Sequence, residues 1–253
     1  MSFRIMYYVS TACPTVERTK EMVDLYVENG VDFFQFDLPS SDPYAETDYM
    51  KQVMKQALEI NDDYDYYMDA IRAIRRQYPG IDISMVVYSD VVQKIGLEKF
   101  VLFLKEIGAV YSGIADMTQE DYDCFDKYGV SYFNAVSYSD PEYDLERLVE
   151  KGVTENDLIG MRTRRRVETI NRKCDSWADR VKMVREYGIQ SKLYAVADIK
   201  TKDDMIERRD AGMDGAIVGN ILMNKWDDRE ALLEVLHSFQ SCAIKENKEM
   251  EED

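Results

Sequence analysis

The sequence predicts an α/β fold, a (β/α)8 TIM barrel with an extra helix after the second strand. Short apolar, β-branched or aromatic runs alternate with longer amphipathic runs throughout the 253 residues. Eight of the short runs have strand character, and most helical runs between them end at a glycine, a common residue at helix C-termini. This repeated order is the pattern of βαβ units, and eight such units in about 250 residues are typical of a closed barrel.

The strands are expected, in chain order, at residues 4–10, 32–39, 82–89, 110–117, 131–137, 157–163, 192–198 and 215–220. Apolar residues at helical spacing cover 16–30, 63–80, 97–108, 119–129, 140–152, 177–188 and 202–212. The run 47–61 has the same spacing and precedes the second unit's own helix, so it is the extra helix. A doubly wound open sheet is the alternative architecture, but no GxGxxG motif follows the first strand.

Composition favours one large domain, residues 1–245, followed by an acidic tail, 246–253. No run reaches the ~20 apolar residues of a membrane helix, and no signal peptide is evident, so a cytoplasmic protein is expected. The net charge of −17 argues against a nucleic-acid partner. Cysteines without CxxC spacing fit free thiols in a reducing compartment; they are Cys13, Cys124, Cys174 and Cys242.

The chain has a single histidine, His237, which argues against a histidine-based catalytic triad and excludes a His-rich metal site. We therefore expect no metal, and we expect acid–base chemistry to fall to Asp, Glu, Tyr, Lys or Cys.

The stretch FFQFDLPSSDPYAE, residues 33–46, carries candidate site residues at the end of an apolar strand. Strand alternation places Gln35 and Asp37 on one face and the aromatic residues on the other. A carboxylate on the inner face of an apolar strand is costly unless it is used or satisfied. Asp37 is thus either a functional acid or a charge neutralised by an arginine such as Arg162.

Five stretches in order resemble the α subunit of tryptophan synthase: YYVSTACPT (7–15), LPSSDPYAE (38–46), MVVYSD (85–90), GIADM (113–117) and AGMDGAIVGNILM (211–223). The extra helix after the second strand is also a feature of that family. The resemblance implies retro-aldol cleavage of indole-3-glycerol phosphate by an acid–base carboxylate, with a second acid holding the indole nitrogen. It implies no cofactor in this chain, since pyridoxal phosphate belongs to a β subunit that receives the indole.

By this resemblance, the catalytic layer consists of Asp37, Glu46 and Gln35, but it departs from the family pattern. The family's catalytic glutamate falls on Gln35, and an amide cannot accept a proton at useful pH. The glycine two residues later falls on Asp37, so a carboxylate has moved roughly 6–7 Å along the strand. The family's aspartate that holds the indole corresponds to Glu46. The alternative interpretation of Glu46 is a charge near a helix N-terminus.

The resemblance also implies six substrate-binding residues: Tyr8, Tyr88, Arg162, Asp198, Gly219 and Asn220. Gly219 and Asn220 match a pair that binds phosphate at a short helix. Asp198 replaces a glycine of that site, or it is the N-cap of the following helix. An arginine-rich loop replaces a glycine-rich one and either clamps an anion or is solvated; it contains Arg162, Arg164, Arg165, Arg166 and Arg172. Asp116 fits a loop cap or a subunit contact better than a catalyst.

Three functions stay open. The first is a lyase of the aldolase type with a rebuilt site, acting on a phosphorylated or carboxylated small molecule. The second is a non-catalytic ligand-binding or regulatory barrel, which Gln35 favours. The third is a genuine tryptophan synthase α subunit that works with a β subunit.

Overall fold

The structure is a computed structural model that describes residues 2–163 and 175–244. The chain forms two compact units. The N-terminal unit is Tyr7–Asn134, and the C-terminal unit combines Met1–Met6 with Ala135–Asp253. Strands β1 and β5 each begin in one unit and end in the other. No helix in the described part of the chain is long and apolar enough to cross a membrane.

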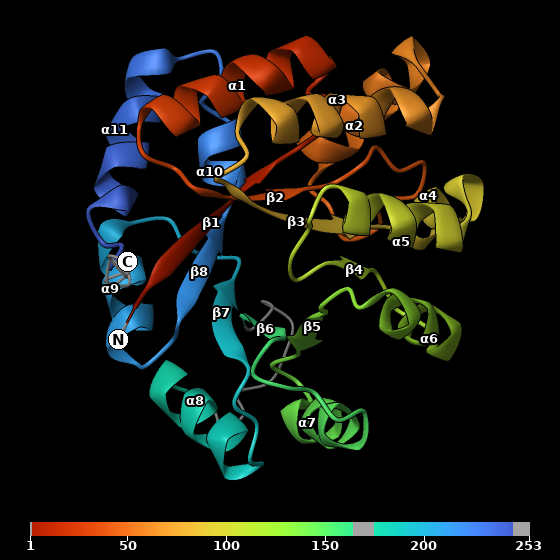
Figure 1. The fold of residues 1–253 in the computed structure, drawn as a ribbon. Helices are drawn as coiled ribbons and strands as arrows, with labels where there is room; N and C mark the ends of the chain where they lie inside the picture. Colours follow the sequence, from red (N-terminus) through yellow and green to blue (C-terminus); the bar gives the residue numbers. More distant parts are fainter. Residues whose placement is uncertain (1, 164–174, 245–253) are drawn as a thin grey trace, which may run out of the picture. The chain divides into compact units, whose positions relative to one another are not determined.

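The N-terminal unit alternates parallel strands with helices, and two helices follow β2 (Figure 1). Its strands lie in the order β4-β3-β2-β1. The elements are β1 (Arg4–Val9), α1 (Val16–Glu28), β2 (Phe33–Phe36), α2 (Asp48–Ile60), α3 (Tyr64–Gln77), β3 (Asp82–Val87), α4 (Ser89–Ile95), α5 (Leu97–Glu106), β4 (Gly113–Ile114), α6 (Gln119–Tyr128) and the start of β5 (Phe133–Val136).

The C-terminal unit continues the alternation, with strands in the order β8-β7-β6-β5. Its further elements are α7 (Pro141–Glu150), β6 (Leu158–Arg162), α8 (Trp177–Glu186), β7 (Lys192–Val196), α9 (Lys202–Asp210), β8 (Gly215–Val218), α10 (Asn220–Met223) and α11 (Arg229–Gln240). The eight predicted strands are all present in the described residues.

The strand ends differ from the prediction, since most strands are shorter than expected. The strand predicted at 110–117 is reduced to Gly113–Ile114, because Tyr111 (φ 50°) and Asp116 (φ 59°) adopt left-handed conformations on either side. The strand predicted to end at residue 198 ends at Val196 for the same reason, since Ala197 and Asp198 have φ values of 67° and 55°. Side-chain type does not reveal these turns.

Each predicted helical run forms a helix, and α4, α10 and α11 lie outside those runs. The sequence prediction missed α4, which begins directly after Tyr88 and is separated from α5 by Gly96. Gly96 has φ 92°, a conformation that would strain any other residue, so it divides one helical run into two.

The first residues of the chain belong to the C-terminal unit because they pair with its last elements. The Phe3 N–H donates to the Ile244 carbonyl (2.8 Å), and the Arg4 N–H donates to the Asp214 carbonyl (3.0 Å). A Cβ at Gly215 would lie 2.3 Å from the Arg4 carbonyl oxygen. Only glycine therefore permits this approach of β1 to the start of β8.

The two faces of β1 and β2 have different chemistry. Tyr7 and Phe34 pack on Tyr26 of α1, with ring centroids 5.9 and 6.3 Å apart, so this face is covered by a helix. Tyr8 lies opposite Gln35 in the parallel ladder and therefore points to the other face. The alternation predicted for the second strand is thus present, and its polar side faces away from α1.

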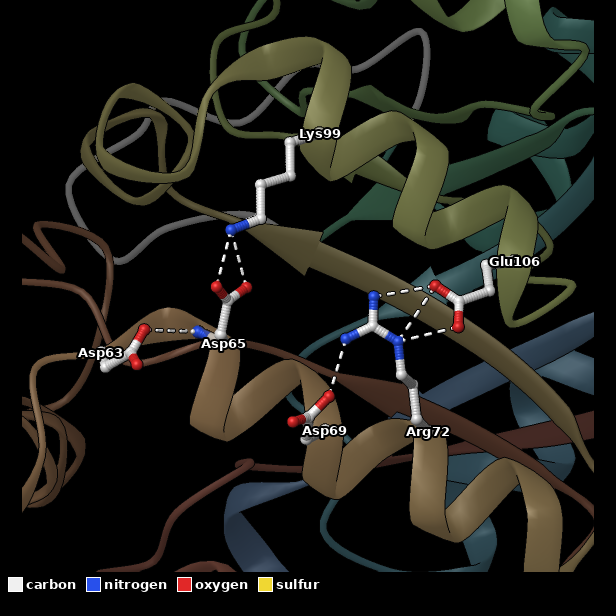
Figure 2. A network of polar contacts seen from close by, with 6 residues as sticks. All are labelled: Asp63, Asp65, Asp69, Arg72, Lys99 and Glu106. Carbon is white, nitrogen blue, oxygen red and sulfur yellow. Dashed lines mark hydrogen bonds and ion pairs between the residues drawn. The ribbon is translucent and has the colours of Figure 1, made fainter.

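Helices α3 and α5 are joined at the surface by a charged cluster (Figure 2). Arg72 of α3 contacts Glu106 of α5 through two nitrogens and also pairs with Asp69 at 2.8 Å. Lys99 of α5 pairs with Asp65 of α3 at 2.7 Å. Lys99, Asp65 and Glu106 are exposed and Arg72 is partly buried, so each pair between the helices is a surface ion pair that contributes little to stability.

Candidate active site

Asp37 follows β2 directly and is 3% exposed. Its Oδ2 accepts a hydrogen bond from the Tyr8 hydroxyl (2.5 Å), and its Oδ1 accepts from the Ser10 hydroxyl (3.1 Å) and the Thr11 N–H (3.0 Å). The Thr11 hydroxyl donates to the Asp37 backbone carbonyl. These contacts hold the residue against the end of β1. The β2 ladder ends at Phe36, although the strand was predicted to reach residue 39.

The neighbours of Asp37 set its charge state. Burial raises the pKa of the carboxyl, while the hydrogen bonds from Tyr8, Thr11 and Ser10 oppose that rise without cancelling it. These donors are neutral. Within the N-terminal unit, these hydrogen bonds therefore stabilise the ionised form of Asp37.

Glu46 places a second carboxyl in the same site. It precedes α2, whose N-cap is Thr47, and its Oε1 accepts a hydrogen bond from the Tyr88 hydroxyl (3.1 Å). Burial raises the pKa of Glu46, and the charge of Asp37 raises it further, against smaller effects of Tyr88 and Lys51. The two carboxyls are therefore close enough for the charge of one to oppose ionisation of the other.

The two tyrosines of the site remain protonated donors. Burial raises the pKa of Tyr8 well above its ordinary value, and the charges of Asp37 and Glu46 raise it further. Burial likewise raises the pKa of Tyr88, followed by the effects of Glu46. The geometry thus contains two tyrosine–carboxylate pairs, Tyr8 with Asp37 and Tyr88 with Glu46.

Gln35 lies on the same strand face as Tyr8, and its other ladder partner is Ser84 of β3. It is 9% exposed, and its Nε2 has no hydrogen-bond partner among the described residues. A buried amide donor without a partner costs free energy unless a ligand or water accepts from it. Gln35 is therefore placed to donate a hydrogen bond to a bound molecule.

The loop 38–47, which carries Glu46, is fastened to the start of α4. Asp90 accepts hydrogen bonds from the Ser40 hydroxyl (2.7 Å), the Ser41 hydroxyl (2.7 Å) and the Ser41 N–H (2.8 Å). Tyr44 of the loop donates to Asp116 and packs edge-on against Tyr88, with ring centroids 5.2 Å apart. Asp116 therefore contacts this loop through the Tyr44 hydroxyl.

Sequence reasoning missed Ser10, Thr11 and Asp90 as members of this arrangement. The available signal was a pair of small hydroxyl residues after the first strand and an acid after the third. It was weak, because such residues also start helices and turns.

The remaining predicted site residues belong to the C-terminal unit. Arg162 is exposed at the end of β6. Asp198 is exposed and pairs with Lys200 at 2.5 Å; the N-cap of α9 is Thr201, so the predicted capping role of Asp198 is wrong. Gly219 is the N-cap of α10, which begins at the exposed Asn220. Outside the described residues lie Arg164, Arg165, Arg166 and Arg172.

Among the described residues, no group of three or more His, Cys, Asp or Glu side chains is arranged to hold a metal ion. The site in the N-terminal unit is thus one of carboxyl, phenol and amide groups.

Two solved structures resemble this chain in fold. It superimposes on the tryptophan synthase subunit alpha of Legionella pneumophila with a TM-score of 0.77 and 18% identity, covering 95% of this chain and 92% of that one. The tryptophan synthase α2β2 complex of Pyrococcus furiosus contains a chain that matches with a TM-score of 0.77 and 14% identity, covering 95% and 100%. The fold is thus a (β/α)8 barrel with an extra helix after the second strand, as predicted.

Sequence comparison extends this likeness. The tryptophan synthase alpha chain of Caldicellulosiruptor saccharolyticus is 25% identical over 239 residues, which cover 92% of this chain and 91% of the relative. The family model described as "Tryptophan synthase alpha chain" matches residues 3–252. Because the family model matches nearly the whole length of this chain, the chain belongs to the tryptophan synthase alpha chain family.

Proposed function

We propose that this chain is a carbon–carbon lyase of the retro-aldol type. Its substrate is indole-3-glycerol phosphate or a similar anionic molecule, and Asp37 and Glu46 provide acid–base catalysis. The observation that carries the proposal is the pair of carboxyls with raised pKa values on neighbouring elements, each hydrogen-bonded by a tyrosine. Paired carboxyls in different environments are a common way to provide one base and one acid at the same pH.

The environments assign the two roles. Asp37 accepts hydrogen bonds from three groups, which favour its ionised form, so it serves as the base. Glu46 accepts a hydrogen bond from Tyr88 alone among these site donors, and the charge of Asp37 opposes its ionisation, so it serves as the acid.

The reaction balances with these two groups. Asp37 accepts the proton of the substrate hydroxyl, and the O–H electrons form the carbonyl of the aldehyde product. Glu46 protonates the indole ring carbon that bears the side chain, which gives an indoleninium cation. The bond between the hydroxyl-bearing carbon and this ring carbon then breaks as the hydroxyl loses its proton, and its electron pair restores the aromatic ring, which gives indole. This scheme uses no cofactor in the chain.

Gln35 has a binding role in this scheme. Its family counterpart is an acid, but here the amide Nε2 is buried and has no protein partner among the described residues. We assign it as a donor to an oxygen of the substrate. Arg162, Gly219 and Asn220 of the C-terminal unit remain proposed contacts for the anionic part of the substrate. Asp198 remains a proposed substrate contact, although its carboxylate repels an anion unless a cation intervenes. The family likeness and the α2β2 assembly named for the Pyrococcus furiosus structure support a β-subunit partner.

The test is turnover of indole-3-glycerol phosphate by the wild-type chain and by Asp37→Asn. Loss of the base should lower kcat by roughly 10²- to 10⁴-fold, the usual contribution of a general base. Asp48→Asn is the matched control, because Asp48 is an exposed acid at the start of α2. Equal kcat values for the wild-type chain and Asp37→Asn would show that Asp37 is not the base.

A non-catalytic binding barrel is the second candidate, and the amide at position 35 is the observation that favours it. Calorimetric titration of the same compound distinguishes the two. Tight binding to the wild-type chain without indole release supports the binding protein, whereas indole release supports the lyase.

A further inference from the structure

The hydrogen bonds of Asp37 leave little of its carboxylate available to a ligand. Ser10 and Thr11 occupy Oδ1 at 3.1 and 3.0 Å, and Tyr8 occupies Oδ2 at 2.5 Å, with Ser10 also 3.3 Å from Oδ2. A carboxylate oxygen has two acceptor directions. Both directions of Oδ1 are filled, and Oδ2 is shared by a short bond and a long one. Because Asp37 is also 3% exposed, direct contact with a substrate proton is restricted.

Tyr8 is better placed for that contact. It lies at the polar face of β1, opposite Gln35, and it is only partly buried, whereas Asp37 is buried. Its hydroxyl already donates its proton to Asp37, so the lone pairs of the same oxygen remain able to accept another. The unpartnered Nε2 of Gln35 belongs to the same face and can hold the oxygen of a substrate beside it.

We propose that Tyr8 is a catalytic residue, a relay that takes the substrate proton at its hydroxyl while it passes its own proton to Asp37. This inference rests on the proposed lyase function and changes the path of its proton. Asp37 then acts through Tyr8 as the terminal acceptor, and Ser10 and Thr11 are positioning residues that orient the carboxylate.

The relay balances without a free phenolate. The substrate O–H bond breaks as a new O–H bond forms at Tyr8, and the original Tyr8 O–H bond breaks as one forms at Asp37 Oδ2. Tyr8 is neutral before and after, which agrees with its raised pKa beside Asp37, Glu46 and Tyr88. After the products leave, Asp37 returns its proton through Tyr8 to water, and Glu46 takes a proton from water.

The decisive variant is Tyr8→Phe, which removes the hydroxyl and keeps the ring. If Tyr8 is the relay, this variant lowers kcat by about the same factor as Asp37→Asn, roughly 10²-fold or more, with a much smaller change in KM. Ser10→Ala is the comparison, because it removes another donor to the same carboxylate without touching the relay. It should lower kcat by less than about tenfold, the size expected for one neutral hydrogen bond.

A solvent isotope experiment on the wild-type chain tests the relay without any substitution. Two protons move in the same step, so kcat should fall along a curve as the fraction of D2O increases. A straight line would mean that one proton moves, and it would overturn the relay.

The outcomes separate the two proposals. Turnover by the wild-type chain, loss in Asp37→Asn and more than a tenth of wild-type kcat in folded Tyr8→Phe would overturn the relay and leave the lyase intact. Absence of turnover by the wild-type chain with indole-3-glycerol phosphate would overturn the lyase function and the relay with it. Thermal unfolding of each variant establishes that it is folded.

Discussion

Glu46, the proposed acid, lies in an unfavourable place for a charge. Burial and the charge of Asp37 raise its pKa above the ordinary value of 4.5, so the folded chain holds the proton more tightly than the unfolded chain does. The stability that this proton contributes is complete below the ordinary value and is lost as pH rises through the folded pKa. Once the pH exceeds the folded pKa, the chain therefore carries a destabilising charge at this position.

Glu46→Gln should raise the unfolding temperature at pH 8, because the amide keeps the shape and removes the charge. Below pH 4 the wild-type side chain is itself neutral, so the difference should vanish. Circular dichroism melts across this pH range measure the effect, and turnover should fall because the acid is lost. Glu59→Gln at an exposed site on α2 is the control. A wild-type chain more stable than Glu46→Gln at pH 8 would contradict this account.

At the scale of elements, the loop 38–47 depends on its attachment to α4. Burial raises the pKa of Asp90, but the hydrogen bonds from Ser40 and Ser41 outweigh it, and the pKa is lowered from 3.8. The stability from this attachment is therefore present above 3.8 and is lost as pH falls through the lower folded pKa. Glu46 lies on the same loop, so its position depends on these bonds.

Asp90→Asn should destabilise the chain by about 1.5–3 kcal/mol at pH 7, the usual size for hydrogen bonds to a charged group. The difference should shrink at pH 3, which lies below the ordinary value of 3.8, because the unfolded chain then binds a proton that the folded carboxyl resists. Urea unfolding at both pH values measures it, and activity should fall with the loosened loop. Asp116→Asn, which alters the hydrogen bond that the Tyr44 hydroxyl donates to the exposed Asp116, is the matched control and should cost less. An equal cost at pH 7 and pH 3 would argue against a charge-dependent attachment.

At the scale of the whole chain, the repeat of strands and helices was readable because it depends on local patterns. Glycines at helix ends and apolar residues at helical spacing indicate where the elements lie, and the family motifs indicate the barrel. Strand ends were not readable, since the strands stop beside left-handed residues that include Tyr111 and Ala197, whose residue types do not favour that conformation.

The candidate site was readable only in part. Strand parity placed Gln35 and Asp37 on one face, and the family pattern pointed to Tyr8, Glu46 and Tyr88. The donors Ser10 and Thr11 were not predictable, because their contacts with Asp37 depend on how the chain turns after β1. A single sequence carries no record of which hydroxyl reaches across from a neighbouring strand.

The net charge of −17 gives the whole molecule a further property. Like charges repel in the compact state, and salt shortens their range from about 30 Å at 0.01 M to about 8 Å at 0.15 M. Salt also weakens favourable pairs such as Arg72–Glu106, which act in the opposite sense (Figure 2). With this excess of acids, repulsion is the larger effect. We therefore expect the unfolding temperature of the wild-type chain to rise between these NaCl concentrations.

Arg72→Met and Lys55→Met separate the two effects, because each makes the net charge more negative by one. Arg72 contacts Glu106, Asp69 and the Phe103 ring, whereas Lys55 has a 3.8 Å pair with Glu59 on an exposed helix face. Arg72→Met should therefore cost up to about 1 kcal/mol more than Lys55→Met at low salt, and this excess should decrease at 0.15 M. Thermal melts of the three proteins in both salt concentrations measure this. A wild-type unfolding temperature that falls with salt would show that the local pairs outweigh the repulsion among the acids.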